Sequence, residues 1–136
     1  MKRVLCLILS LLLVMLSITP ALAAETEASV MPRYSHIGQI YAYLQIGSLG
    51  LSSCQANCYI ESGDHVVLTV QLRQYNGSSW TTLKTWTATD SSYAAISKNY
   101  AVPKGYTYCV RASCAVYDAS GTLVDMGICN SNQVVY

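Results

Sequence analysis

The groups that could carry catalysis are few. The chain of 136 residues has two histidines, His36 and His65, and seven Asp or Glu that are scattered through its expected loops. Asp64 directly precedes His65, and neighbouring side chains of a strand point to opposite faces, so this pair forms no dyad by itself. The sequence contains no Gly-x-Ser-x-Gly elbow, His-Glu-x-x-His motif, phosphate-binding loop or Asp-rich calcium loop. We therefore expect a protein that is not an enzyme and that holds no cofactor.

The six cysteines offer either a metal site or disulfides. Three residues separate Cys54 from Cys58, and four separate Cys109 from Cys114. Both pairs fall in expected strands, where Cys54 and Cys58 would lie about 13 Å apart, whereas zinc sites bring two cysteines together in a tight turn. Cysteines of exported proteins usually form disulfides. We therefore expect disulfides and no metal site.

The first 23 residues have the features of an export signal. A short basic segment precedes an apolar run of about 15 residues that ends near Ile18, and Ala21 and Ala23 supply the small residues that a signal peptidase requires. This run is shorter than the roughly 20 residues that span a bilayer. We expect a signal peptide over residues 1–23, a flexible leader over residues 24–35 and one domain over residues 36–136. The mature protein would be secreted and extracellular, with no membrane partner after cleavage.

The charge of the expected mature chain is close to zero. Lys2 and Arg3 leave with the signal, so six of the eight Lys and Arg remain against seven Asp and Glu. Nucleic-acid binding requires a clustered basic surface, which this balance does not supply. The expected partner is an extracellular protein or a glycan, and not a nucleic acid.

From Ile37 onward the sequence is typical of β-structure, with frequent Val, Thr, Tyr and Trp and without the apolar spacing of a helix. Alternating polarity predicts seven strands, over residues 37–46, 50–60, 65–75, 80–88, 94–102, 106–117 and 122–131. This number of strands favours an all-β fold, a seven-stranded antiparallel two-sheet sandwich that is immunoglobulin- or fibronectin type III-like. A small β-barrel of another type is the alternative. In such sandwiches a Tyr at the start of the sixth strand bonds back to the preceding corner, and Tyr106 and Tyr108 are the candidates.

Tryptophan and charged side chains give the chain a candidate binding face. If Leu83 points into the core, its strand presents Trp80, Lys84 and Trp86 outward. The candidate binding residues that share this face are Trp80, Trp86, Arg73, Arg111, Lys84 and Tyr117. Arg stacked on Trp stabilises an exposed surface by about 0.5–1 kcal/mol, while the same residue types anchor interfaces and stack on sugars. The face is therefore either a structural cation–π ladder or a recognition surface, and outward Tyr41, Tyr43 and Tyr59 on the other sheet have the same two interpretations.

The expected faces of the strands restrict the disulfides. Five cysteines remain after cleavage, so at most two bonds form and one thiol is left over. Cys54, Cys58 and Cys114 share the apolar faces of their strands, Cys109 lies on a polar face, and Cys129 faces outward if its apolar neighbours face inward. These faces predict a Cys58–Cys114 bond through the core, as in antibody domains, and a Cys109–Cys129 bond across the outer face. Cys54 is then a buried free thiol.

Several segments together resemble a family of bacterial proteins. They are Leu72-Arg73-Gln74-Tyr75, Gly77-x-x-Trp80 with Leu83 and Lys84-Thr85-Trp86, Lys104-Gly105-Tyr106-Thr107-Tyr108, and Val116-Tyr117-Asp118. The family is uncharacterised and contains small secreted proteins of Gram-positive, largely clostridial, bacteria, each with a signal peptide and one β-sandwich. The resemblance covers most of the mature chain but departs at Cys109, where a basic residue is expected, and Arg111 takes that role two residues later. It implies a compartment and a fold, and no activity, because none is established for the family.

These observations favour a secreted, non-catalytic binding or interaction module. The alternatives are a carbohydrate-binding domain that uses exposed Trp and Tyr side chains, and a structural extracellular protein that assembles through its edge strands. A small hydrolase or antimicrobial effector would need a polar cleft, for which the sequence has too few acids and histidines.

Overall fold

The computed structural model describes residues 34–136, so the expected signal peptide (residues 1–23) and most of the expected leader (residues 24–35) lie outside the described residues. The strands are β1 (Ile37–Ile46), β2 (Leu51–Ile60), β3 (His65–Tyr75), β4 (Trp80–Asp90), β5 (Tyr93–Ala101), β6 (Thr107–Tyr117), β7 (Leu123–Asn130) and β8 (Val134–Val135). All seven expected strands are present, and their ends differ from the expected ones by at most two residues. No helix in this part of the chain is long and apolar enough to cross a membrane.

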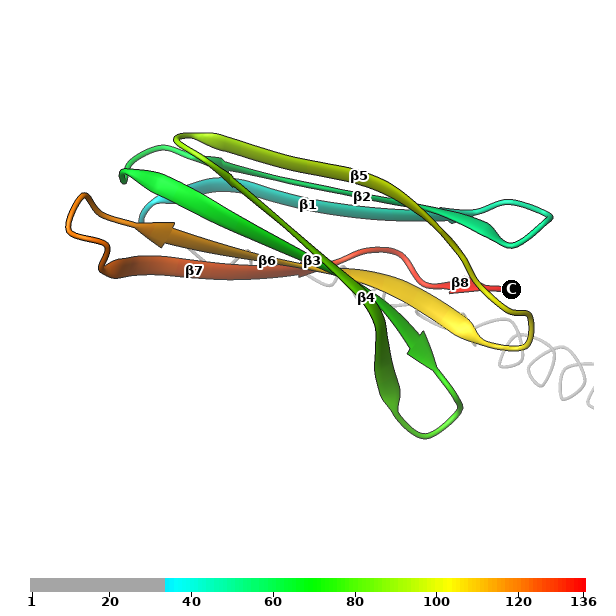
Figure 1. Cartoon of the computed structure of the whole chain (residues 1–136). Helices are drawn as coiled ribbons and strands as arrows, with labels where there is room; N and C mark the ends of the chain where they lie inside the picture. The colour runs from blue at the N-terminus through cyan, green and yellow to red at the C-terminus, as the bar shows by residue number, and fades with distance from the viewer. Residues whose placement is uncertain (1–33) are drawn as a thin grey trace, which may run out of the picture. The chain divides into compact units, whose positions relative to one another are not determined.

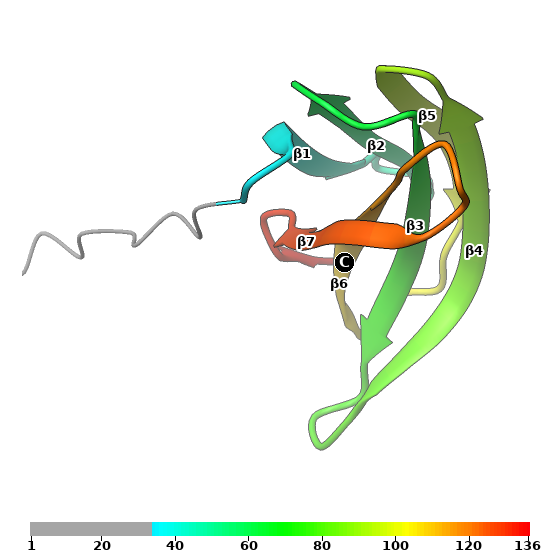
Figure 2. The same cartoon turned by 90° about the vertical axis from the view of Figure 1, so that its left-hand side faces the viewer.

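Two antiparallel sheets form a sandwich, which confirms the predicted fold class. One sheet has the strand order β1-β2-β5 and the other β4-β3-β6-β7, with β8 paired to β6. Figure 1 shows the two layers, and Figure 2 shows β4 passing along one side of the sandwich beside β5. The end of β3 and the start of β4 extend together as a two-stranded ribbon beyond the layers (Figure 1). This order is compatible with the fibronectin type III-like arrangement.

The core lies between the sheets and is built by every second residue of the central strands. The inward side chains of β3 and β6 are completely buried: Val66, Leu68, Val70 and Leu72, and Val110, Ala112, Cys114 and Val116. Burying one Val or Leu side chain contributes about 1.5–3 kcal/mol. The intervening residues of the same strands therefore form the outer face of the sheet.

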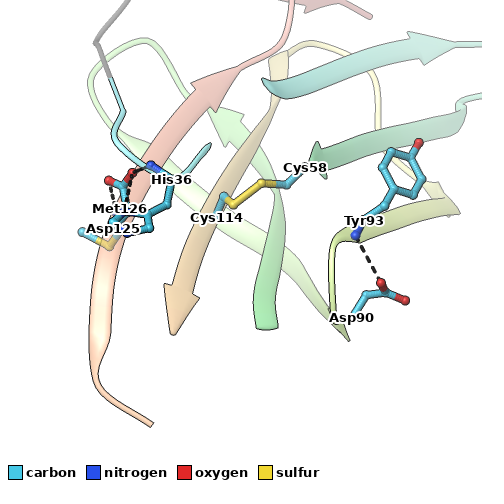
Figure 3. Close-up of a disulfide and its surroundings, with 7 residues drawn as sticks. All are labelled: His36, Cys58, Asp90, Tyr93, Cys114, Asp125 and Met126. Atoms are coloured by element: carbon cyan, nitrogen blue, oxygen red, sulfur yellow. Dashed lines mark hydrogen bonds and ion pairs between the residues drawn. A yellow bond between two sulfur atoms is a disulfide. The ribbon is translucent and has the colours of Figure 1, made fainter. Parts of the chain in front are cut away.

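One disulfide joins the two sheets through this core. Cys58 of β2 is bonded to Cys114 of β6, with their Cα atoms 6.4 Å apart (Figure 3), which confirms the first predicted bond. Cys54 is buried and free, as expected. Burial raises the pKa of the Cys54 thiol, although the Ser52 hydroxyl beside it acts in the opposite direction.

The second predicted bond, Cys109–Cys129, is wrong, because both cysteines are free. Cys129 pairs in register with Ala112, whose side chain faces the core, whereas Cys109 pairs with Arg73 on the outer face. The expectation failed because Met126 and Ile128 do not face inward and are 55% and 41% exposed. The intervening Gly127 faces the core instead, where an added Cβ would clash with Ile40 of the opposite sheet.

Tyr108 fastens the corner between β5 and β6, as predicted for one of the two candidate tyrosines. Its side chain is fully buried, and its hydroxyl donates a hydrogen bond of 2.6 Å to the carbonyl oxygen of Pro103. Gly105 takes the turn with a φ of 93°, a conformation that glycine adopts without strain. The corner thereby fixes the direction in which β6 enters the sheet.

Candidate binding surfaces

A β-bulge in β4 divides the aromatic face that the sequence predicts. Leu72 pairs with Lys84 but the next residue, Arg73, pairs with Thr82, so Leu83 is an extra residue in its strand. An extra residue reverses which side chains point outward beyond it. Trp80 therefore lies on the outer face, whereas Trp86, opposite buried Val70, packs against the core.

The six candidate binding residues consequently occupy separate places, and the single predicted face is wrong. Arg73, Trp80 and Arg111 share the outer face of the β4-β3-β6-β7 sheet, where Arg73 lies over the Trp80 ring and both arginines act on Cys109. Tyr117 shares that face but lies at the far end of β6, where its ring stacks on His65 with centroids 5.1 Å apart. Trp86 and Lys84 lie on the opposite, core-facing side of β4, and Lys84 is exposed there because β4 is an edge strand.

The first candidate surface is a hollow beside Arg73 and Trp80. The guanidinium carbon of Arg73 is 5.7 Å from the centre of the Trp80 ring. The Tyr75 ring also packs against Trp80, with the two ring centroids 5.2 Å apart. Beside them is a hollow of about 120 Å³, which we call the basic hollow, and its lining residues are Arg73, Trp80, Cys109, Asn130, Ser131 and Gln133. The Nε atom of Arg73 is buried and has no hydrogen-bond partner among the described residues.

The segment between β7 and β8 completes the basic hollow. Ser131 anchors this segment to β6, because its backbone N–H donates to the Val110 carbonyl and its hydroxyl accepts from the Val110 N–H, both at 2.8 Å. Asn130 and Gln133 then lie at the rim of the hollow. Sequence reasoning missed these residues because the segment has neither alternation nor a motif, and only its position beside β6 makes it part of a site.

Two guanidinium groups, those of Arg73 and Arg111, act on the thiol of Cys109 in the basic hollow. Cys109 is buried there, and burial raises the pKa of its thiol, although the guanidinium groups of Arg73 and Arg111 favour the thiolate. Burial prevails, so the thiol stays neutral at neutral pH and does not compensate the two guanidinium charges.

The second candidate surface is the outer face of the β1-β2-β5 sheet. The strand register places Tyr41, Tyr43, Tyr59 and Tyr93 there, and their exposed fractions range from 37% to 51%. The side chains between them are neutral and mostly polar: Gln39, Gln45, Ser53, Gln55, Asn57, Ala95, Ser97 and Asn99. We call this set of residues the tyrosine face.

None of the three strands contributes a charged side chain to the tyrosine face. Lys98 of β5 pairs with buried Cys54 and so belongs to the core-facing side, while Glu61 lies just beyond the end of β2. A hollow of about 370 Å³ opens in the middle of the face, lined by Tyr41, Gln55, Ala56, Asn57, Ala95, Ile96 and Ser97. The sequence predicted Tyr41, Tyr43 and Tyr59 as outward but missed Tyr93, because the fifth strand begins one residue earlier than expected.

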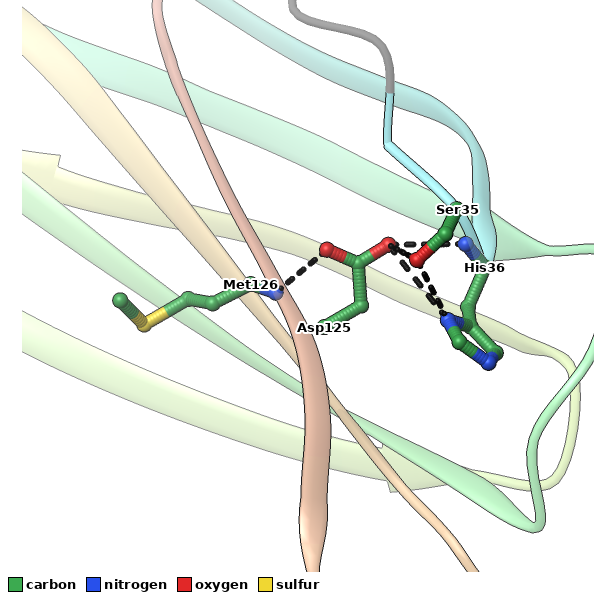
Figure 4. A network of polar contacts seen from close by, with 4 residues as sticks. All are labelled: Ser35, His36, Asp125 and Met126. Atoms are coloured by element: carbon green, nitrogen blue, oxygen red, sulfur yellow. Dashed lines mark hydrogen bonds and ion pairs between the residues drawn. The ribbon is translucent and has the colours of Figure 1, made fainter.

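Each histidine is beside an aspartate. His36, Ser35 and Asp125 form a small network in which the Asp125 carboxylate accepts the backbone N–H groups of His36 and Met126, both at 2.8 Å (Figure 4). Ser35 Oγ and Asp125 Oδ2 both approach the same imidazole nitrogen, Nδ1, at 2.8 and 3.8 Å. A Ser-His-Asp triad needs its serine and its aspartate on different nitrogens of the histidine, so this network has no triad geometry. Its hydrogen bonds instead tie the start of β1 to β7.

Asp64 and His65 correct an expectation about neighbouring side chains. His65 Nδ1 lies 3.0 Å from Asp64 Oδ2, so the two groups do meet. The rule of alternating faces fails here because Asp64 precedes β3 and is not part of the strand. Both side chains are about a third or more exposed, at 35% and 54%. The pair lies at the surface, away from both hollows.

No group of three or more His, Cys, Asp or Glu gathers into a possible metal site within residues 34–136. Comparison with known proteins found no family model and no curated protein that matches the chain.

Proposed function

We propose that the chain is a secreted, non-catalytic binding module, that the tyrosine face is its binding surface and that a neutral glycan is the ligand the surface fits best. The observation that supports this is the register of β1, β2 and β5, which gathers four exposed tyrosines among neutral polar side chains around one hollow.

The chemistry of the tyrosine face complements that of a sugar. A Tyr ring offers a flat apolar surface and a hydroxyl at its edge, which suits the apolar C–H face and the hydroxyl rim of a pyranose. Gln55 and Asn57 each add an amide that donates and accepts hydrogen bonds at the hollow. Because the face carries no charge, a neutral ligand binds it without the cost of desolvating an unpaired ion.

Secretion is part of the proposal. A disulfide such as Cys58–Cys114 persists in oxidising compartments, and the first 23 residues have the pattern of an export signal. Membership of the clostridial-type secreted family that the sequence resembles would place the module at or beyond the surface of a Gram-positive cell, where polysaccharides are abundant.

Affinity electrophoresis of the mature domain through gels that contain neutral polysaccharides tests the ligand. We expect a gel of the right polysaccharide to retard the native protein, and Tyr41→Ala or Tyr59→Ala to weaken binding about fivefold or more, because each removes one stacking ring. Trp80→Ala is the matched control, since it removes an aromatic ring from the other sheet and should leave the retardation unchanged.

A protein ligand is the other outcome that this design detects. If no neutral polysaccharide retards the domain but a culture protein is retained by the native form and lost by both Tyr variants, the surface is right and the glycan is wrong. If the Tyr variants bind like the native protein in every assay, the tyrosine face is not the binding surface.

A further inference from the structure

The ionised side chains of the sandwich are sorted into two groups. All five Asp and Glu of residues 34–136 lie at the end where β2, β4 and β6 finish: Glu61, Asp64, Asp90, Asp118 and Asp125. The five Lys and Arg lie in the other half or in its end turn: Arg73, Lys84, Lys98, Lys104 and Arg111. In this part of the chain no Lys or Arg comes within 4.0 Å of a carboxylate, and the two basic side chains that do are His36 and His65.

The basic hollow is therefore left without an Asp or Glu counter-charge among the described residues. Asp125 pairs in register with Val116, five residues along β6 from Arg111, which is about 16 Å at the rise of a strand. This separation exceeds the screening length of about 8 Å at physiological salt, so the Asp and Glu side chains of the described residues do little to offset the charge of Arg73 and Arg111. The neutral thiol of Cys109 between them does not offset it either.

The way Arg73 is held leaves the terminal nitrogens of its guanidinium group without a partner among the described residues. Its carbon lies over the Trp80 ring, so one face of the group is covered, and its Nε atom is buried without a partner. An unpaired buried donor is costly and is normally satisfied by a ligand or water. The two terminal nitrogens are not buried in this way and make no hydrogen bond with a described residue. They form a planar fork, which matches the two oxygens of a carboxylate.

We propose that the basic hollow binds a carboxylate group, with Arg73 as its two-pronged ligand, Arg111 as a second positive charge, and Asn130, Ser131 and Gln133 as polar neighbours. A hollow of about 120 Å³ has room for one carboxylate with the atom that bears it. The bound group is therefore one end of a larger molecule, either an acidic sugar or the end of a peptide. This site is separate from the tyrosine face, and neither proposal depends on the other.

Titration of the mature protein with sodium acetate, at ionic strength held constant with sodium chloride, tests the site. The readouts are the Nε–H resonance of Arg73 in ¹H–¹⁵N spectra and the fluorescence of Trp80. We expect both to change with one saturable curve. Arg73→Lys keeps the charge but loses the fork, and it should weaken acetate binding about tenfold or more.

Two further variants separate a built site from general attraction. Lys84→Gln removes a positive charge on the other side of β4 and should leave acetate binding unchanged. Gln133→Glu, at an exposed position, places a carboxylate at the rim of the hollow and should abolish acetate binding by occupying Arg73 internally. Its normal melting curve would show that the fold is intact.

The source of the carboxylate is read from two matched pairs of probes. A uronic-acid oligosaccharide is compared with its methyl ester, and a short peptide with a free carboxy-terminus is compared with its amide; the acid form that competes with acetate identifies the source. The proposal is overturned if acetate gives no saturable response, if Arg73→Lys binds acetate like the native protein, or if sulfate and phosphate bind more tightly than every carboxylate.

Discussion

Trp80 and Trp86 are the same residue type in one strand, yet they have different surroundings because of the single extra residue at Leu83. Trp80 covers the Arg73 guanidinium on the outer face, while Trp86 lies opposite Val70 and packs against the core. Stacking on an exposed cation contributes less to stability than filling space beside a core. The two tryptophans should therefore respond differently to truncation.

We expect Trp86→Ala to lower the free energy of unfolding by about 2–3 kcal/mol, because it leaves unfilled space beside the core. Trp80→Ala should cost only about 0.5–1 kcal/mol, the contribution of an exposed cation–π pair. Urea unfolding followed by circular dichroism measures both. Equal losses would mean that the bulge does not turn Trp86 inward.

Tyr108→Phe tests the corner between β5 and β6. The substitution keeps the buried ring but removes the hydroxyl that donates to Pro103, so we expect a loss of about 1 kcal/mol in the free energy of unfolding. Tyr106→Phe is the control, since the described hydrogen bonds assign no such role to its hydroxyl. A Tyr108→Phe protein as stable as the native one would show that the ring alone holds the corner.

At the scale of the strands, three aspartates hold turns and strand ends together at the end of the sandwich where β2, β4 and β6 finish. Asp90 accepts the backbone N–H group of Tyr93 (Figure 3) and that of Ser92. Asp118 accepts the backbone N–H groups of Ser120 and Thr122. The Ser92 N–H is the main cause that lowers the pKa of Asp90, and the Ser120 hydroxyl is the main cause for Asp118. For Asp125, burial raises the pKa, but the backbone N–H groups of His36 and Met126 outweigh it and the pKa is lowered.

These lowered pKa values predict how stability depends on pH. A carboxyl group with a lower pKa in the folded state contributes stability that is fully present above its unfolded pKa of about 3.9 and is lost as the pH falls through its folded pKa. We expect the free energy of unfolding in urea to fall steeply below about pH 4. Asp118→Asn and Asp125→Asn should each flatten that fall. A native protein with constant stability down to the folded pKa values would contradict the hydrogen bonds of these three groups.

The strands themselves could be predicted from the sequence, but the faces of β4 and β7 could not. Alternating polarity is a local pattern, so it identifies a strand without knowledge of the neighbouring strands. In β3 and β6 the alternation is continuous, and it therefore also placed Cys114 correctly on the core side. In β4 the bulge at Leu83 reverses the alternation, and no residue type marks it. In β7 the apolar Met126 and Ile128 point outward because Ile40 takes the space under Gly127, a tertiary contact that the local sequence does not contain.

At the scale of the whole molecule, a disulfide is the covalent bond between the two sheets of the described residues. Cys58 and Cys114 are 56 residues apart, and closing a loop of that length restricts the unfolded chain by about 4 kcal/mol. We expect the Cys58→Ala/Cys114→Ala double variant to lose about this much stability, measured by urea unfolding against the Cys54→Ala variant as a single-thiol control.

The same bond fixes the number of free thiols. In the denatured, unreduced mature protein we expect three titratable thiols, those of Cys54, Cys109 and Cys129, and one disulfide-linked peptide pair. Ellman titration and non-reducing peptide mapping measure these quantities. A single free thiol, with Cys109 joined to Cys129, would show that β7 presents its other side to the core.

The tyrosine face and the basic hollow belong to different sheets and look away from each other across the core. Opposed sheets of a sandwich lie about 10 Å apart, so a molecule on one outer surface leaves the other open. If both proposed sites bind, one copy would hold two unlike molecules at once and act as a tether between them. Such joining would need no dimer, and the disulfide-linked sandwich would set the distance between the joined molecules.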